Sequence, residues 1–162
     1  MKVDNLSDLF VHTLKDIYFA ENQIIKALPK MAKAADSKEL ARAFDHHLEE
    51  TKEQVARLDQ IFKMLGKRAE GEKCPAIEGI LKEGEDLMKH IKDPDTRDAA
   101  MLAAAQAVEH YEITRYGTLI SWGGLLDLPD VVKLLSMTLK EEYGADSKLS
   151  KLAESKLNRE AA

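Results

Sequence analysis

The sequence has few residues of the kinds that cross-link a chain or interrupt helices. Cysteine occurs once, as Cys74, which excludes an intramolecular disulfide and is typical of a reducing compartment. We interpret it as a small buried side chain, the usual role of a lone cysteine. Only 4 prolines and 8 glycines occur among 162 residues, so little in the chain opposes long helices.

Long hydrophobic runs are also missing. The opening segment MKVDNLSDLF lacks the apolar centre of a signal peptide. No apolar run approaches the roughly 20 residues that a membrane span needs. We therefore expect a cytoplasmic protein with no membrane partner.

Neither sign of charge dominates. The chain has 24 Lys and Arg against 29 Asp and Glu, for a net charge of -5, and no basic run stands out. Binding to nucleic acid or to an anionic membrane depends on basic patches. The charge pattern argues against both of these partners.

Apolar residues recur in steps of three and four, which is typical of helices packed in a bundle. This spacing predicts long helices over about 5–34, 37–65, 94–122 and 129–157. Gly123 and Gly124 are expected to break the third of these. A long crossover holds a short helix at about 75–90, and residues 1–162 are expected to form one domain. The sequence thus predicts an all-α fold, a four-helix bundle with a crossover connection.

Each long helix carries acids near the middle of its apolar row. They are Glu21 in the first helix, Glu50 in the second, Glu109 and Glu112 in the third, and Glu142 and Asp146 in the fourth. Each helix rises about 1.5 Å per residue, so these positions can share one level of an antiparallel bundle. Glu50 lies with His47 and Gln54 on a more polar row that flanks the core row of the second helix, and His47 and Gln54 are weaker candidates for the same site.

Carboxylates gathered inside a bundle need positive charge, because an unpaired buried carboxylate costs several kcal/mol. Arg115 is one candidate counter-ion, but it offers a single charge. Two divalent ions would neutralise four carboxylates, and oxygen-rich ligands favour iron or manganese over zinc or copper. The usual pattern for such a pair of ions includes Glu-x-x-His on two helices. Here His47 precedes Glu50 instead, and no His follows Glu142.

Three segments together resemble the YciE/YciF family of ferritin-like bacterial stress proteins. They read FDHHLEETKEQVARLDQIF, DAAMLAAAQAVEHYEITRYGTL and LKEEYGADSKLSKLA, and the start FVHTLKDIYFAENQ is also similar. The resemblance implies a ferritin-like bundle, a homodimer with the short helix at its interface, and expression under stress. It also implies likeness to a di-iron core, with Glu21, Glu50, Glu112 and Glu142 at its four helix positions. Glu109, Gln54 and Asp146 would then lie near the remaining ligand positions.

Two functions follow as hypotheses. The first is a protein with two iron or manganese ions per chain that consumes a small oxidant, dioxygen or peroxide. The second is a metal-poor structural or interaction bundle that acts through a protein partner under stress. A weaker third hypothesis is iron storage, which requires a shell of many subunits.

Overall fold

The computed structural model describes residues 3–162, and all regular secondary structure in that range is helical. The predicted all-α class is therefore confirmed. The elements are α1 (Leu6–Ala34), α2 (Lys38–Met64), α3 (Pro75–His90), α4 (Pro94–Leu125), α5 (Pro129–Leu152), a π-helical turn (Ala153–Leu157) and α6 (Asn158–Glu160). None of these helices combines the length and apolar content that a membrane crossing needs.

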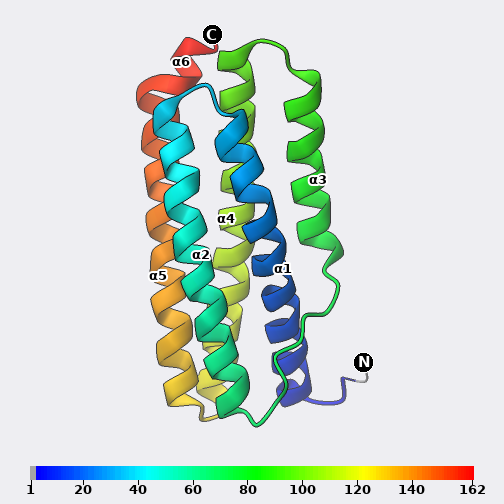
Figure 1. Ribbon diagram of the computed structural model, residues 1–162. Helices are drawn as coiled ribbons and strands as arrows, with labels where there is room; N and C mark the ends of the chain where they lie inside the picture. Colours follow the sequence, from blue (N-terminus) through cyan, green and yellow to red (C-terminus); the bar gives the residue numbers. More distant parts are fainter. Residues whose placement is uncertain (1–2) are drawn as a thin grey trace.

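Four long helices form the bundle (Figure 1). α1 packs against α2, and α4 packs against α5. Contacts between α1 and α4 and between α2 and α5 close the ring. Neighbouring long helices run in opposite directions (Figure 1). α3 lies outside the ring, against α4 and α1.

Local sequence signals begin the helices. Asn5 caps α1 by accepting a hydrogen bond from the backbone N–H of Asp8 at 2.9 Å. Asp93 caps α4 in the same way through Thr96 N–H, at 2.8 Å. Such caps satisfy N–H groups that have no partner within the helix. Gly66, which follows α2, has φ 63°, a backbone conformation that glycine adopts without a steric penalty.

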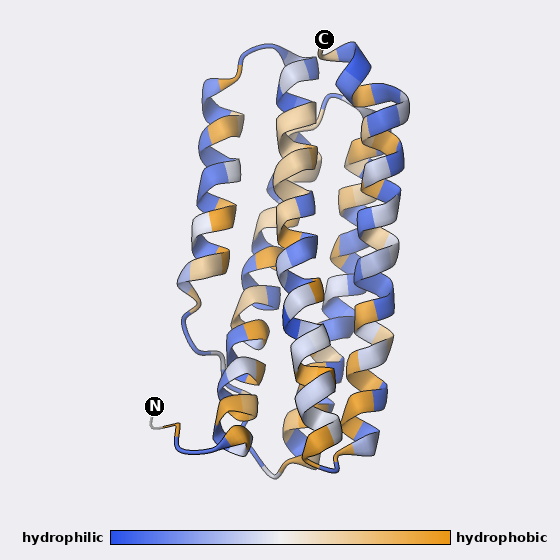
Figure 2. Cartoon of the chain, turned by 180° about the vertical axis from the view of Figure 1, so that it is seen from behind, coloured by the Kyte–Doolittle hydropathy of each residue, from blue (hydrophilic) through white to orange (hydrophobic). Residues whose placement is uncertain are grey.

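The apolar rows of the helices face inward and form one core. Figure 2 shows hydrophilic residues over most of the outward surfaces and apolar residues where helices meet. Phe10, Leu14 and Ile17 from α1 are fully buried, as are Leu58 and Ile61 from α2. This core holds the middle of each helix at a fixed position, which is where the acids lie.

Two expected helix ends differ from the structure. α4 continues through Gly123 and Gly124 to Leu125, beyond the expected end at Trp122. A Cβ atom on Gly123 would lie 2.9 Å from Val132 Cγ2, so this glycine permits close packing of α5 and does not interrupt α4. α5 ends at Leu152, and a π-helical turn buries Leu157 where the same helix was expected to continue.

The crossover, residues 65–74, runs closely along α1. The backbone N–H of Glu72 donates to the carbonyl oxygen of Lys15 at 3.1 Å. His12 Nδ1 lies 3.1 Å from a carboxylate oxygen of Glu72. A Cβ on Gly71 would lie 3.0–3.3 Å from atoms of Phe19. A larger residue at position 71 would therefore push the crossover away from the bundle.

Asp98, in the first turns of α4, is a buried acid with a structural role. Its two carboxylate oxygens accept hydrogen bonds from the backbone N–H groups of Asp36 and Ser37, at 3.0 and 2.6 Å. The side chain is 1% exposed. It therefore fixes the α1–α2 turn against α4.

Asp98→Ala is expected to lower the free energy of unfolding by about 2–3 kcal/mol, because two buried N–H groups lose a charged acceptor. Urea unfolding followed by circular dichroism measures the change. Asp36→Ala is the matched control: the Asp36 side chain is exposed and its backbone N–H is retained, so a change within about 0.5 kcal/mol is expected. Equal effects of the two substitutions would contradict this role for Asp98.

Candidate metal centre

The inward faces of four helices meet at a polar cluster near the middle of the bundle. Glu21 comes from α1, His47 from α2, Glu109 and Glu112 from α4, and Glu142 from α5. All five side chains are buried. The three-residue step between Glu109 and Glu112 places both on one face of α4. We refer to these five residues as the central cluster.

Four members of the central cluster can reach one point. His47, Glu109, Glu112 and Glu142 each offer a ligand atom, and these atoms all lie within 4.8 Å of one another. Ligands bound at about 2.1 Å from a shared ion lie at most about 4.2 Å apart. Small side-chain movements would therefore let all four bind the same ion.

When all four carboxyls are ionised, most polar atoms of the central cluster have no hydrogen-bond partner among residues 3–162. These atoms are Glu21 Oε2, Glu109 Oε2, both carboxylate oxygens of Glu112 and of Glu142, and both ring nitrogens of His47. His47 Nε2 lies 3.2 Å from Glu109 Oε1, although the geometry is not that of a hydrogen bond. Buried polar atoms are nearly always paired in folded proteins, and these are the atom types that bind metal ions. The residues therefore fit a metal centre.

Basic side chains do not neutralise these carboxylates. The ion pairs among residues 3–162 place no Lys or Arg against Glu21, Glu109, Glu112 or Glu142, and His47 is the one base beside them. Arg115, the counter-ion suggested by the sequence, instead lies 3.4 Å from Asp16 and over the ring of Tyr111. That suggestion was wrong because Arg115 points away from the central cluster.

Burial and mutual repulsion make these carboxyls hard to ionise. Burial raises the pKa of Glu112 well above its usual value, and the charges of Glu21 and Glu142 add to the shift. Burial likewise raises the pKa of Glu142 and of Glu109, and it raises the pKa of Glu21 to about 7. Burial opposes the charged form of His47, but Glu50 and Glu109 outweigh it and raise its pKa. Without added cations, the central cluster therefore holds protons at neutral pH, and these protons link Glu21 with Glu112 and Glu109 with Glu142.

Tyr116 fixes one carboxylate of the central cluster. Its hydroxyl donates to Glu21 Oε1, and the tyrosine is fully buried. Burial, followed by the charge of Glu21, raises the pKa of Tyr116 well above its usual value. The hydroxyl therefore stays protonated and holds Glu21 in one orientation, leaving Oε2 free.

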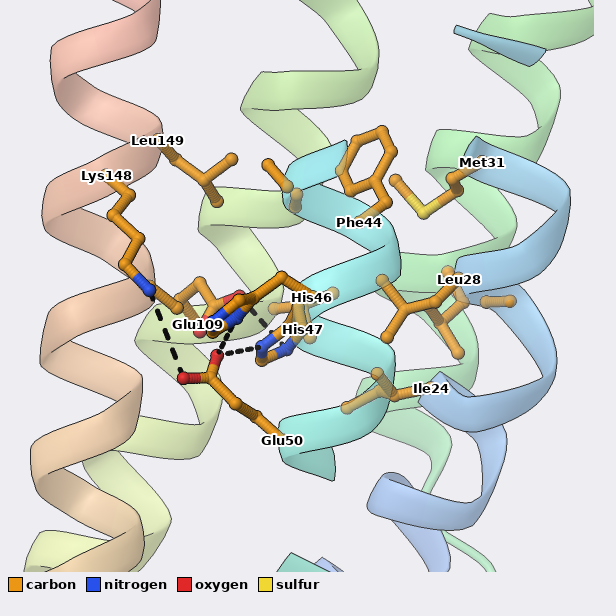
Figure 3. Close-up of a pocket in the computed structure, with 16 residues that line it drawn as sticks. Ile24, Leu28, Met31, Phe44, His46, His47, Glu50, Glu109, Lys148 and Leu149 are labelled. Atoms are coloured by element: carbon orange, nitrogen blue, oxygen red, sulfur yellow. Dashed lines mark ion pairs between the residues drawn. The ribbon is translucent and has the colours of Figure 1, made fainter. Parts of the chain in front are cut away.

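Glu50 lies at the edge of the central cluster. Its carboxylate is 24% exposed and lies 3.0 Å from His46, 3.9 Å from His47 and 4.0 Å from Lys148 (Figure 3). His47 contributes most to lowering its pKa, and Lys148 also contributes. Glu50 is therefore an ionised acid at the rim, next to one face of His47.

Two other predicted residues have different partners. Asp146 is half-buried and lies 3.3 Å from His110, and it also accepts a hydrogen bond from Gln106 at 3.2 Å. Gln54 is buried and donates to Glu141 at 3.2 Å. The structure keeps Asp146 outside the central cluster. Gln54 Oε1, like the cluster's own atoms, is buried without a hydrogen-bond partner among residues 3–162. His47, which the sequence ranked as a weaker candidate, lies within it.

An apolar cavity of about 50 Å³ adjoins the central cluster. His47, Glu50 and Glu109 form its polar side, and Ile24, Leu28 and Phe44 are among its apolar residues (Figure 3). We call it the inner cavity. It gives room beside the carboxylates for a molecule of only a few atoms.

Comparison with known proteins gives full-length matches. Residues 5–162 match the family described as Domain of unknown function (DUF892). The chain is 41% identical to Protein YciF of Escherichia coli K12 over 162 residues, which cover 99% of this chain and 98% of that protein.

Solved structures agree with this result. The crystal structure of the E. coli stress protein YciF matches with a TM-score of 0.92, covering 96% of this chain and 99% of that one. YcfI from Rhodopseudomonas palustris is 49% identical, with a TM-score of 0.91 and coverage of 92% and 95%. A Xanthomonas campestris protein at 21% identity and a TM-score of 0.70 shares the fold.

Proposed function

Because this chain belongs to the DUF892 family, we propose that it is a ferritin-like di-metal protein, with iron or manganese, that consumes dioxygen or peroxide. The observation that carries the proposal is the central cluster. Four buried carboxylates and one histidine present unpaired atoms to one another, without a Lys or Arg to neutralise them. The E. coli relative is described as a stress protein, and consumption of an oxidant would suit such a role.

The charge of the central cluster supports two ions. Four ionised carboxylates carry four negative charges, and two divalent ions balance them. His47, Glu109, Glu112 and Glu142 would hold the first ion. Glu21, whose free oxygen faces no hydrogen-bond partner, would hold the second together with a carboxylate shared from Glu112. A ligand set of mostly oxygen atoms favours iron or manganese.

The chain would supply the surroundings for this chemistry. When bound, redox-active ions of this kind supply electrons to an oxidant. Tyr116 would keep Glu21 oriented, and Glu50 would orient the ring of His47. The apolar wall of the inner cavity would limit water around the reacting molecule, which strengthens electrostatic interactions there.

Metal analysis with a peroxide-consumption assay tests the proposal. Protein purified without chelator and loaded with iron or manganese should carry close to two ions per chain and consume peroxide. Less than about 0.2 ions per chain after loading would overturn it, because ligands this buried should retain their metal. The same protein treated with chelator is the control.

Metal loading should also stabilise the fold. At a free metal concentration about 100 times the Kd, binding adds about 2.7 kcal/mol to the free energy of unfolding. For a chain of this size, that corresponds to a Tm increase of roughly 5–10 °C. Differential scanning calorimetry with and without chelator measures the shift.

A second candidate is a metal-poor structural bundle acting through a protein partner. The description of the similar protein YcfI as a candidate structural protein favours this second function. In this case the chelator should leave the Tm unchanged. We further propose that the protein is a cytoplasmic homodimer. We also propose that it has no nucleic-acid partner, as its net charge of -5 favours. Analytical sedimentation measures the particle mass and so separates a dimer from a storage shell.

A further inference from the structure

A second and larger cavity lies outside the four-helix ring. It measures about 470 Å³ and lies between α1, α3 and α4, where α3 stands beside the bundle (Figure 1). This volume falls within the range of small-molecule sites. We call it the α3 groove, defined by its apolar lining of Met31, Ile80, Leu81, Met88, Met101 and Val108.

The lining of the α3 groove suits a flexible apolar chain. Met31, Met88 and Met101 contribute thioether side chains, which adapt their shape to a ligand. Gly84 is buried on α3, and a Cβ there would lie 3.0 Å from the Cβ of Ala104 on α4. The groove is therefore a narrow space beside a close helix contact.

The α3 groove adjoins the inner cavity. Ala27, Met31, Leu81 and Val108 line both. The inner cavity reaches His47 and Glu109, and its wall includes Ile24, Leu28 and Met31 (Figure 3). A thin apolar wall therefore separates the α3 groove from the inner cavity at the edge of the central cluster.

The rim of the α3 groove has unbalanced positive charge. Its acids Glu78 and Glu85 lie 3.4 Å from Lys73 and 3.0 Å from Lys89, respectively. Lys26 and Lys30 line the groove from successive turns of α1. Neither has a close ion pair with any residue in the described range 3–162, although Lys30 is near enough to Glu85 to help lower the pKa of that carboxyl. An anionic group fits there by charge complementarity.

We propose that the α3 groove binds a linear carboxylic acid of the fatty-acid class. Its carboxylate lies between Lys26 and Lys30, and its chain follows the methionines toward Ala27 and Val108. Binding of the acid needs no metal.

Isothermal titration with decanoate, below its micelle concentration, tests this proposal on full-length protein with and without chelator. Saturable binding at one site per chain is expected. The double substitution Lys26→Glu with Lys30→Glu should weaken it at least about tenfold by reversing the local charge. Lys33→Glu is the matched control: Lys33 is exposed on the same helix but does not line the groove, and it should leave the affinity unchanged.

A second variant tests the inner end of the α3 groove. Ala27→Phe adds a large side chain where the groove meets the wall of the inner cavity, and it should reduce the preference for decanoate over hexanoate, with folding checked by circular dichroism. Absence of saturable binding, or equal effects of the Lys33 control and the double substitution, would overturn the proposal. A third outcome would also overturn it: the protein binds no decanoate, and the double substitution lowers its particle mass. A second copy of the chain would then be what covers the groove. Decanoate binding without metal uptake would contradict only the proposed function. Metal uptake without decanoate binding would contradict only the inference about the groove.

Discussion

Replacing Glu112 by glutamine is expected to abolish metal binding while making the metal-free protein more stable at pH 8, by about 1–3 kcal/mol. Glu112 is fully buried, and both of its carboxylate oxygens lack a hydrogen-bond partner. Glutamine keeps the shape and removes the cost that Glu112 pays on folding, either by burying a charge near Glu21 and Glu142 or by taking up a proton to avoid it. Metal analysis after loading, together with urea unfolding in chelator, measures both effects.

Glu141→Gln provides the matched control. Glu141 is next to Glu142 in the chain but does not belong to the central cluster. Arg57 donates to both carboxylate oxygens of Glu141 through its two terminal nitrogens, Nη1 and Nη2, and the Nη2 hydrogen bond measures 2.7 Å. Loss of this two-point ion pair should cost about 1–3 kcal/mol and leave metal binding intact. The two substitutions thus have opposite expected signs. Marked destabilisation of the metal-free Glu112→Gln protein would show that a protein counter-charge holds Glu112.

The metal-free protein is also expected to lose stability as the pH rises from about 5 to 8. The pKa of Glu21 is about 7 in the folded chain, against an ordinary value of 4.5, so the folded state binds more protons across this window. Stability therefore falls as the pH rises through it. At 1.36 kcal/mol per pKa unit, Glu21 alone contributes about 3 kcal/mol, and Glu109, Glu112 and Glu142 act in the same direction.

Loading with metal should reverse this slope, because metal ions compete with protons for the same oxygens. Thermal unfolding at a series of pH values, with chelator and with manganese, gives both curves. Glu112→Gln should flatten the chelator curve. A metal-free protein whose stability is constant or rises between pH 5 and 8 would contradict the account.

The helical fold was predictable because its signals are local. Apolar steps of three and four, together with caps such as Asn5 and Asp93, depend on neighbours within one helix. The glycine pair at 123–124 misled the prediction since the reason for Gly123 is non-local: Val132, on the next helix, needs the space.

The candidate site was predictable to a lesser degree. Glu21, Glu112 and Glu142 interrupt apolar rows and are buried together. Glu50 and Asp146 have the same sequence signal but end half-exposed, because a small rotation of a helix decides whether a flanking position meets the core or the solvent. The sequence pointed to His47 because it shares a helical row with Glu50 and Gln54, and the structure places it beside Glu109.

Asp98 had no sequence signal that separates it from a surface acid at a helix start. Its partners are the backbone N–H groups of Asp36 and Ser37, about sixty positions earlier in the chain. Pairings over such distances depend on the completed packing of α4 against the α1–α2 turn. The groove beside α3 was hidden for the same reason, since its lining comes from three helices.

Anomalous scattering at the manganese and iron edges, from crystals of loaded protein, gives the position of each bound ion. We expect metal peaks enclosed by His47, Glu109, Glu112 and Glu142, with a second ion beside Glu21. Carboxylates in this arrangement with no peak between them, or peaks confined to surface acids such as Asp146, would contradict this expectation.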